Sequence, residues 1–299
     1  MSTSTGIHIL GNTLNVVCLK KSENGYHLTG LLNHTLSTSF DFDQDSGPSQ
    51  TLIDEFNQVL NTNLPTPLPP ISIALTGGLY HIQKVPLEVA GKEDRDDQIE
   101  WEAAQALISP SQDRIIDFIP AGRVAFWTAM HKRVIDAHET LCHAITDVSL
   151  SFTVEPLALF YAGHPTDAWQ PGRQAAIHLA KPWSSLVSVE DGLLTAAETV
   201  RAADHSGTQS HQIRQWISGD LTGSRPPYSE VFLSGEANDI PLDDISHTTD
   251  ITFSAYPGFQ NIDTTQLANP PGNECASKFT IAIGAAIHHI AQKETGDNV

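Results

Sequence analysis

Short runs in which apolar and polar residues alternate open the chain, and this pattern predicts β-strands. The predicted strands are 7–10, 14–20 and 26–35, with Gly- and Asn-containing turns between them. Apolar residues then recur with a helical period over 49–60, and a proline-rich link leads to an apolar run at 71–75. This order of three strands, a helix and a strand predicts a mixed sheet with helices packed on it.

The pattern changes after Gly77, where strand-like and helix-like runs follow one another closely. The predicted elements are strand 79–87, helix 94–108, strands 114–119 and 124–130, helix 132–146 and strand 150–154. Acidic residues gather at the start of helix 94–108, where carboxylates suit the positive end of the helix dipole. We interpret this stretch as an inserted α+β unit.

The rest of the chain repeats the plan of the first part. The predicted elements are helix 156–162, a linker at 165–172, strands 174–179, 185–189 and 193–200, helix 208–217, strands 231–234 and 251–255, and helix 275–292. The last helix is mostly apolar, and its Gly284 permits close packing against a neighbouring element. The pattern as a whole predicts an α/β protein with two similar mixed sheets and an α+β insert.

Composition narrows the function classes. The 299 residues are 40% apolar, enough for a substantial core and more than one packed unit. Thirty-five acidic residues against sixteen basic ones give a formal net charge of −19, so the surface repels phosphate backbones and anionic headgroups. Nucleic acid and direct membrane binding are therefore not expected.

Cysteine usage and the absence of targeting patterns favour a cytoplasmic protein. Cys18, Cys142 and Cys275 are odd in number and far apart, which is typical of reduced, buried thiols rather than a disulfide framework. The amino terminus has no basic segment of a signal peptide. The most apolar stretch, 279–290, is too short to span a membrane.

Common catalytic and ligand-binding motifs are absent from the sequence. It contains no Walker A loop, GxGxxG, GxSxG or HExxH. His138 and Cys142, four residues apart on a predicted helix, are the nearest approach to a metal motif, but no third ligand has a suitable spacing. We therefore predict no metal site and interpret helix 132–146 as a solvated amphipathic helix.

Several segments resemble one known family. The helix Asp97–Ile108 is similar to the "E-x-I-x-W-E-A-x-Q-Y-I-P" helix of PilM-type proteins, cytoplasmic components of type IV pilus machinery with an actin-like (ribonuclease H-like) fold. Asp113–Phe118, Val154–Leu159, Val231–Gly235 and Phe279–Ala285 resemble further segments of that family. Similar actin-like halves occur in the L-type platform protein of type II secretion.

The resemblance implies a division of the chain. The first actin-like subdomain spans 1–76 and is completed by 155–165 and the C-terminal helix 274–293. The inserted α+β subdomain spans 77–154. The second actin-like subdomain spans 173–272, with a shortened insertion at 201–229.

The nucleotide-site motifs of the family are degenerate in this chain. Nucleotide-binding members begin each of two phosphate-gripping hairpins with Asp-x-Gly, in which the aspartate holds hydrated Mg²⁺. The corresponding hairpin residues of this chain are His8, Gly11, Asn12, Thr13 and His178. The family also has a loop that contacts adenosine, and the residues at its place are Gly235 and Glu236. No aspartate remains at either hairpin, and Glu236 would repel a polyphosphate, so we expect no cofactor and weak or absent nucleotide binding.

The resemblance favours a non-catalytic cytoplasmic scaffold of a type IV pilus or related secretion machine. Its expected partner is the N-terminal cytoplasmic tail of a bitopic inner-membrane protein. Through this partner the chain would lie at the cytoplasmic side of the inner membrane. The sequence leaves open whether the chain also forms a homo-oligomer. One alternative is an ATPase or kinase-like enzyme that binds ATP and Mg²⁺ with Asp191 or Asp204. Another is an acidic adaptor unconnected with pili.

The resemblance also implies a peptide groove between the first sheet and the insert. The expected groove residues are Tyr80, Ile82, Val85, Ile99, Trp101 and Ala103. An extended tail would pair with the strand edge and place aliphatic side chains in apolar pockets, and the acidic surface would attract Lys or Arg in the tail. If these residues form the groove, Ala103→Glu should abolish tail binding and leave the melting temperature nearly unchanged.

Overall fold

The first sheet combines an antiparallel meander with parallel strands. The computed structural model describes residues 2–40, 47–88, 91–107, 113–142, 149–166, 168–201, 216–217, 228–235, 251–267, 269, 271–272 and 276–295. The strands of this sheet are β1 (Ser2–Leu10), β2 (Thr13–Ser22), β3 (Gly25–Thr35), β4 (Ile71–Leu75), β8 (Leu150–Val154) and β14 (Ile262–Asp263). Their order is β14-β3-β2-β1-β4-β8, with β4 parallel to β1 and β8 parallel to β4.

The second sheet repeats this plan. Its strands are β9 (Arg173–Leu179), β10 (Trp183–Glu190), β11 (Leu193–Arg201), β12 (Glu230–Gly235) and β13 (Phe253–Ala255). Their order, β11-β10-β9-β12-β13, matches β3-β2-β1-β4-β8, with the same antiparallel meander followed by parallel strands. The predicted α/β fold with duplicated mixed sheets is confirmed. The central strands β1 and β9 occupy equivalent places in the two halves.

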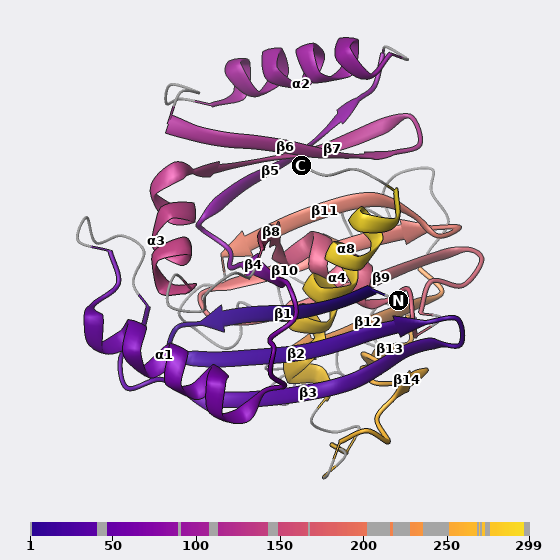
Figure 1. The fold of residues 1–299 in the computed structure, drawn as a ribbon. Helices are drawn as coiled ribbons and strands as arrows, with labels where there is room; N and C mark the ends of the chain where they lie inside the picture. Colours follow the sequence, from indigo (N-terminus) through magenta and orange to yellow (C-terminus); the bar gives the residue numbers. More distant parts are fainter. Residues whose placement is uncertain are drawn as a thin grey trace.

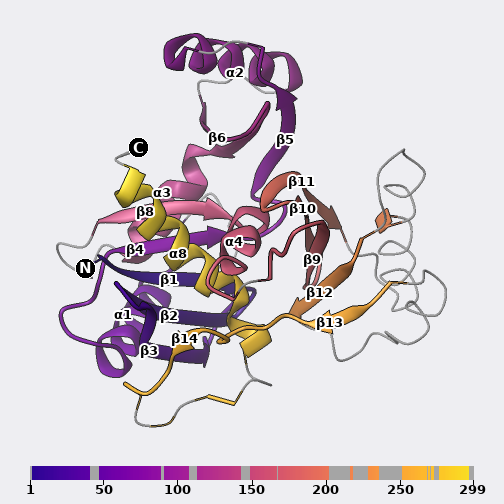
Figure 2. The same cartoon turned by 90° about the vertical axis from the view of Figure 1, so that its right-hand side faces the viewer.

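Helices cover both faces of the first sheet. The helices α1 (Gln50–Asn63) and α3 (Lys132–Cys142) pack on one face, where their apolar side chains join those of β1, β2 and β4. The helices α4 (Glu155–Ala162) and α8 (Thr280–Thr295) lie between the two sheets and share one core with both (Figure 2). Because α8 is enclosed in this way, residues 281–290 are buried all round the helix.

Two glycines allow α8 to approach its neighbours at backbone distance. A Cβ at Gly284 would lie 1.7 Å from the Ala158 carbonyl oxygen of α4. A Cβ at Gly6 of β1 would lie 1.8 Å from the Ala282 carbonyl oxygen of α8. The sequence-based expectation for Gly284 is confirmed, and α8 is held between α4 and β1.

The insert forms a separate small layer. Its antiparallel sheet has the order β5 (Tyr80–Pro86), β7 (Val124–His131), β6 (Arg114–Ala121), and α2 (Lys92–Ala106) packs on one face of it (Figure 1). Trp127 of β7 is fully buried beneath α2. Because β7 is the central strand, β6 is paired along one side only in the part of the chain that the structure describes.

Some predicted elements differ from the structure. The short strand β14 was not predicted, and the last helix begins at Thr280 after a 3-10 turn rather than at 275. The predicted helix 208–217 falls almost entirely outside the described residues. No helix in the described part of the chain combines the length and the apolar character that a membrane crossing requires.

The interpretation of helix 132–146 as solvated is wrong for the face that carries His138 and Cys142. Both side chains are buried, and His138 packs edge-on against Phe40 and Phe152. Burial raises the pKa of the Cys142 thiol to about 12 and that of the Cys18 thiol to about 11. These two cysteines are therefore unreactive core residues, as predicted, whereas Cys275 lies outside the described residues.

Candidate functional site

The two hairpin positions that depart from the Asp-x-Gly pattern meet between the halves of the molecule. His8 lies near the end of β1 and His178 near the end of β9, and their rings are 5.6 Å apart between centroids. Glu155, the first residue of α4, completes the group. The exposed fraction is 1% for His8, 1% for Glu155 and 2% for His178. We call them the His8–Glu155–His178 cluster.

Hydrogen bonds fix the carboxylate of Glu155. Its Oε1 lies 2.9 Å from Nε2 of His8. Its Oε2 accepts hydrogen bonds from the Ser185 hydroxyl at 2.8 Å and from the Gly77 backbone N–H at 3.1 Å. The carboxylate is thereby connected to the first sheet, the second sheet and the start of the insert, since these donors come from all three.

The second histidine has a different environment. Its Nδ1 is 3.0 Å from the Ser234 hydroxyl at the end of β12, while its Nε2 is buried with no hydrogen-bond partner. Burial lowers the pKa of His178 to about 4 despite the opposing charge of Glu155. Burial also raises the pKa of Glu155, but the hydrogen bond with His8 and the electrostatic interactions with both imidazoles outweigh it, so that this pKa is lowered. At neutral pH the cluster therefore holds a carboxylate and a neutral His178.

The remaining described residues of the degenerate nucleotide site lie at the turn that follows β1 and at the end of β12. Gly11 has a φ of +59° and forms the tight turn after β1. The carbonyls of Gly11 and Asn12 accept hydrogen bonds from residues that follow β3, and Thr13 begins β2. Gly235 has a φ of +79°, and a Cβ there would lie 2.2 Å from the Leu179 carbonyl oxygen. Glu236 lies outside the described residues.

The aspartates considered as replacement magnesium ligands do not join the cluster in the described part of the chain. Asp191 follows β10 at the end where Glu190 pairs with Arg173. His178 lies at the other end of β9, roughly 16 Å along the strand at about 3.3 Å per residue. Asp204 lies outside the described residues.

The contribution of Glu155 was not recognised in the sequence. It stands in a stretch that matches the family pattern, and nothing in its spacing connects it with His8 or His178. The available signal was a single acidic residue at the junction of a buried strand and an almost wholly apolar helix. A buried carboxylate at such a place needs partners, and the sequence does not identify them.

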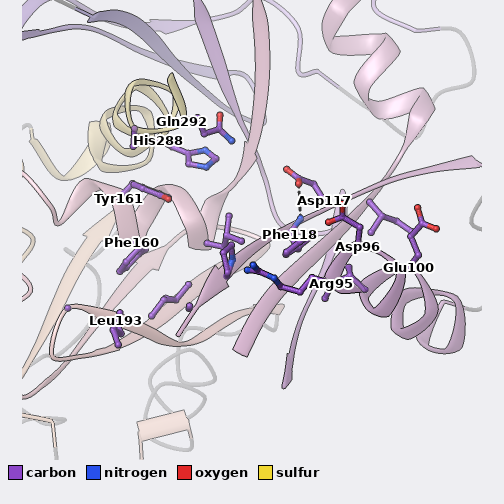
Figure 3. Close-up of a pocket in the computed structure, with 18 residues that line it drawn as sticks. Arg95, Asp96, Glu100, Asp117, Phe118, Phe160, Tyr161, Leu193, His288 and Gln292 are labelled. Carbon is purple, nitrogen blue, oxygen red and sulfur yellow. Dashed lines mark hydrogen bonds between the residues drawn. The ribbon is translucent and has the colours of Figure 1, made fainter. Parts of the chain in front are cut away.

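A pocket of about 780 Å³ lies between the insert and the body of the molecule (Figure 3). It is lined by Arg95, Asp96, Ile99 and Glu100 of α2, residues 116–121 of β6, Phe160 and Tyr161 of α4, residues 192–194 of the β10–β11 hairpin, and His288, Ala291 and Gln292 at the end of α8. Leu193 faces it with an exposed fraction of 55%. β6, an edge strand of the insert sheet in the described part of the chain, thus borders a partly apolar cavity.

Acidic groups predominate among the charged residues of this pocket. Asp96, Glu100 and Asp117 contribute carboxylates, and Arg95 contributes a guanidinium. Burial raises the pKa of Asp117, although the Phe118 N–H donates a hydrogen bond to its carboxylate at 2.7 Å. A basic group entering the pocket would stabilise the charged form of Asp117.

The structure changes the walls of the groove expected from sequence. Ile99 of α2 lines the pocket. Ala103, on the same helix, is buried together with Val85 in the core of the insert. Trp101 has an exposed fraction of 61% and does not line the pocket. Ala103→Glu is therefore expected to disrupt the insert, which corrects the expectation of an unchanged melting temperature.

The other two expected groove residues join the insert to the body. Tyr80 and Ile82 of β5 pack against the core that lies between the two sheets. The Tyr80 hydroxyl is 2.8 Å from the Thr199 hydroxyl of β11. The pocket lies at β6, on the opposite edge of the insert sheet, so the strand that borders it is β6 rather than β5.

Comparison with solved structures identifies the fold. A PilM–PilN type IV pilus biogenesis complex contains a chain that matches with a TM-score of 0.79 at 13% identity, covering 96% of this chain and 98% of that one. The chain has an actin-like fold. A Bacteroides thetaiotaomicron protein described as having an actin-like ATPase fold and unknown function matches with a TM-score of 0.52 at 11% identity, covering 84% of this chain and 90% of that one.

A third similar structure comes from another secretion system. It is the cytoplasmic domain of EpsL, an inner-membrane component of the type II secretion system of Vibrio cholerae, with a TM-score of 0.54 at 8% identity, covering 96% of this chain and 95% of that one. No protein-family model and no curated protein matches the chain. The actin-like, PilM-type architecture expected from the sequence is confirmed at the level of the fold.

Proposed function

We propose that this chain is a non-catalytic cytoplasmic scaffold of a pilus or secretion machine. In this function it binds the extended N-terminal cytoplasmic tail of a bitopic inner-membrane protein in the pocket beside β6. The observation that carries the proposal is a partly apolar pocket of about 780 Å³ bordered by β6, which is an edge strand among the described residues. An extended peptide gains backbone hydrogen bonds from such an edge and specificity from the side-chain pockets next to it.

The similar structures support this assignment. The PilM chain that matches over nearly its whole length is part of a complex with PilN, and EpsL is an inner-membrane component of a secretion system. The acidic lining and the net charge of −19 favour a tail with Lys or Arg, and cytoplasmic segments next to a membrane are rich in both.

The absence of catalysis is supported by the contents of the nucleotide site. His8 and His178 replace the aspartates that would hold Mg²⁺, and both are joined to protein groups between the halves. Buried imidazoles offer nothing to a polyphosphate bound with hydrated Mg²⁺, which prefers oxygen ligands. The competing ATPase function requires carboxylates at the two hairpin positions, where this chain has His8 and His178. The carboxylate beside them, Glu155, comes from α4 and is hydrogen-bonded to protein groups of both sheets, and Asp191 lies at the far end of the β9–β10 ladder.

The experiment compares Leu193→Glu with Trp101→Glu. The probes are fluorescent synthetic peptides with the sequences of N-terminal cytoplasmic tails of bitopic membrane proteins encoded beside this chain, and fluorescence polarisation measures their affinity. Leu193→Glu should weaken binding at least about tenfold, because it places a carboxylate at the apolar side of the pocket. Trp101→Glu should leave the affinity unchanged, because Trp101 does not line the pocket.

Both substituted side chains are more than half exposed, so both variants should keep the wild-type melting temperature. Ile115→Glu is a further control, because Ile115 is an exposed residue of β6 outside the pocket lining. If Trp101→Glu abolishes binding and Leu193→Glu does not, the tail binds on the outer face of α2 and the proposed pocket is wrong. Failure of all tail peptides to bind the wild type would contradict the scaffold function itself.

A further inference from the structure

The His8–Glu155–His178 cluster has the composition of a metal site. Each of the three residues offers a ligand atom, and these atoms all lie within 4.8 Å of one another. In the described part of the chain this is the one group of three or more His, Cys, Asp or Glu residues with that geometry. The three residues come from β1, α4 and β9, so a bound ion would join the two halves through α4.

The polar atoms of the cluster are incompletely satisfied by protein groups. Nε2 of His178 and Nδ1 of His8 are buried without a hydrogen-bond partner. Leaving a buried polar atom without a partner is unfavourable, and a buried carboxylate is retained only where it is paired or coordinates a metal. A cation at the cluster would take up the lone pair of His178 Nε2 and part of the charge of Glu155.

We propose that the His8–Glu155–His178 cluster binds Zn²⁺ through these three side chains, with the fourth coordination position left to water or another small ligand. Two imidazoles and one carboxylate form a ligand set that zinc uses in proteins. The same set is unsuited to Mg²⁺ and Ca²⁺, which take oxygen ligands almost exclusively. The proposal is independent of tail binding, because the cluster residues do not line the pocket at β6.

The surroundings already orient two of the ligands. An Nδ1–H of His178 that donates to the Ser234 hydroxyl leaves the Nε2 lone pair free for a metal. The Ser185 hydroxyl and the Gly77 N–H both donate to Oε2 of Glu155, which leaves Oε1 directed toward His8. Such outer-shell hydrogen bonds fix the tautomer and direction of metal ligands.

The test begins with the full chain stripped of metal by EDTA and dialysed. Titration with Zn²⁺ in competition with a chromophoric chelator should give one ion per chain with a Kd of about 0.1 μM or tighter. Addition of Zn²⁺ should raise the melting temperature, because the ion binds the folded state only. His178→Gln should weaken binding by more than about 100-fold, and Ser234→Ala should weaken it about tenfold.

The matched control is His27→Gln. His27 also lies 2.9 Å from a carboxylate, that of Asp263, but this pair is partly exposed and has no third ligand. The control should bind Zn²⁺ like the wild type. Equal loss in His27→Gln and His178→Gln, or a Kd of the wild type weaker than about 100 μM, would overturn the proposal.

A second variant protects the test against unfolding of His178→Gln. His178→Cys keeps a metal ligand but changes its chemistry. With Co²⁺ in place of Zn²⁺, and with Cys275→Ser in both proteins, this variant should show a thiolate-to-metal charge-transfer band that the parent lacks, because Cys18 and Cys142 are buried in the core beside α1 and α3. If folded His178→Cys takes up Co²⁺ without this band, His178 is not a ligand and the proposal is wrong.

Discussion

Replacing Gly284 with alanine should destabilise the protein, although helix propensity alone predicts the opposite. Alanine is more favourable than glycine inside a helix by up to about 1 kcal/mol. A Cβ at this position, however, would lie 1.7 Å from the Ala158 carbonyl oxygen and 2.5 Å from its carbonyl carbon, whereas ordinary van der Waals contact begins at 3.4 Å. Both atoms belong to the backbone of α4 and cannot rotate away.

The helix α8 has no room to retreat from α4. On its other side α8 packs directly against Gly6 of β1. A Cβ at Gly6 would lie 1.8 Å from the Ala282 carbonyl oxygen of α8. Overpacking of this kind costs typically 1–3 kcal/mol, and we expect the upper end because backbone confines α8 on two sides. After subtraction of the gain in propensity, the net loss in free energy of unfolding is about 2 kcal/mol.

Thermal unfolding followed by circular dichroism measures this loss. A net loss of about 2 kcal/mol corresponds to a decrease in Tm of roughly 3 °C for a chain of 299 residues, and urea unfolding gives the free energy directly. Gly6→Ala should show a comparable decrease. Gly11→Ala separates steric overlap from backbone strain, because Gly11 has a φ of +59° but open space around its Cβ position, and should cost only about 1 kcal/mol. An increased Tm for Gly284→Ala would refute the reasoning.

Three further predictions concern pH, nucleotide and shape. Burial lowers the pKa of His138 from 6.5 to about 4, against a hydrogen bond from its Nδ1–H to the Val134 carbonyl. Since the unfolded chain takes up this proton at higher pH, His138 should contribute a fall of up to about 3 kcal/mol in the free energy of unfolding between pH 6.5 and below 4. Burial also lowers the pKa values of His178 and His288 to about 4, so urea titrations of the wild type and His138→Leu should isolate the part of His138 as the difference between their slopes. Calorimetric titration with MgATP should detect no binding of micromolar affinity, because both hairpins lack the Mg²⁺-binding aspartate; a micromolar Kd would contradict this. Small-angle scattering should not change when nucleotide is added, because α4 and α8 already join the two halves, and a decrease in radius of gyration would show closure on a ligand instead.

Local patterns in the sequence were sufficient for the elements and their repetition. Short strand-like runs bounded by turn residues identified the two meanders, and a mostly apolar helix with Gly284 indicated close packing of α8. The repeated order of strands and helices led to the duplicated fold, and the missing aspartates at His8 and His178 were visible as single residues. None of these conclusions depends on which distant segments come into contact.

The functional surfaces depended on such contacts and were decided by the tertiary structure. The pattern of α2 places Ile99 and Ala103 on one apolar face, but it does not indicate that this face covers Ala103 in the core of the insert and leaves Trp101 exposed. Period-two alternation gives the faces of a strand but not its neighbours, and only the pairing order shows that β6 borders the pocket. Glu155 meets His8 and His178 because packing of α4 between two sheets brings three distant segments together, and spacing along the chain carries no information about such a meeting.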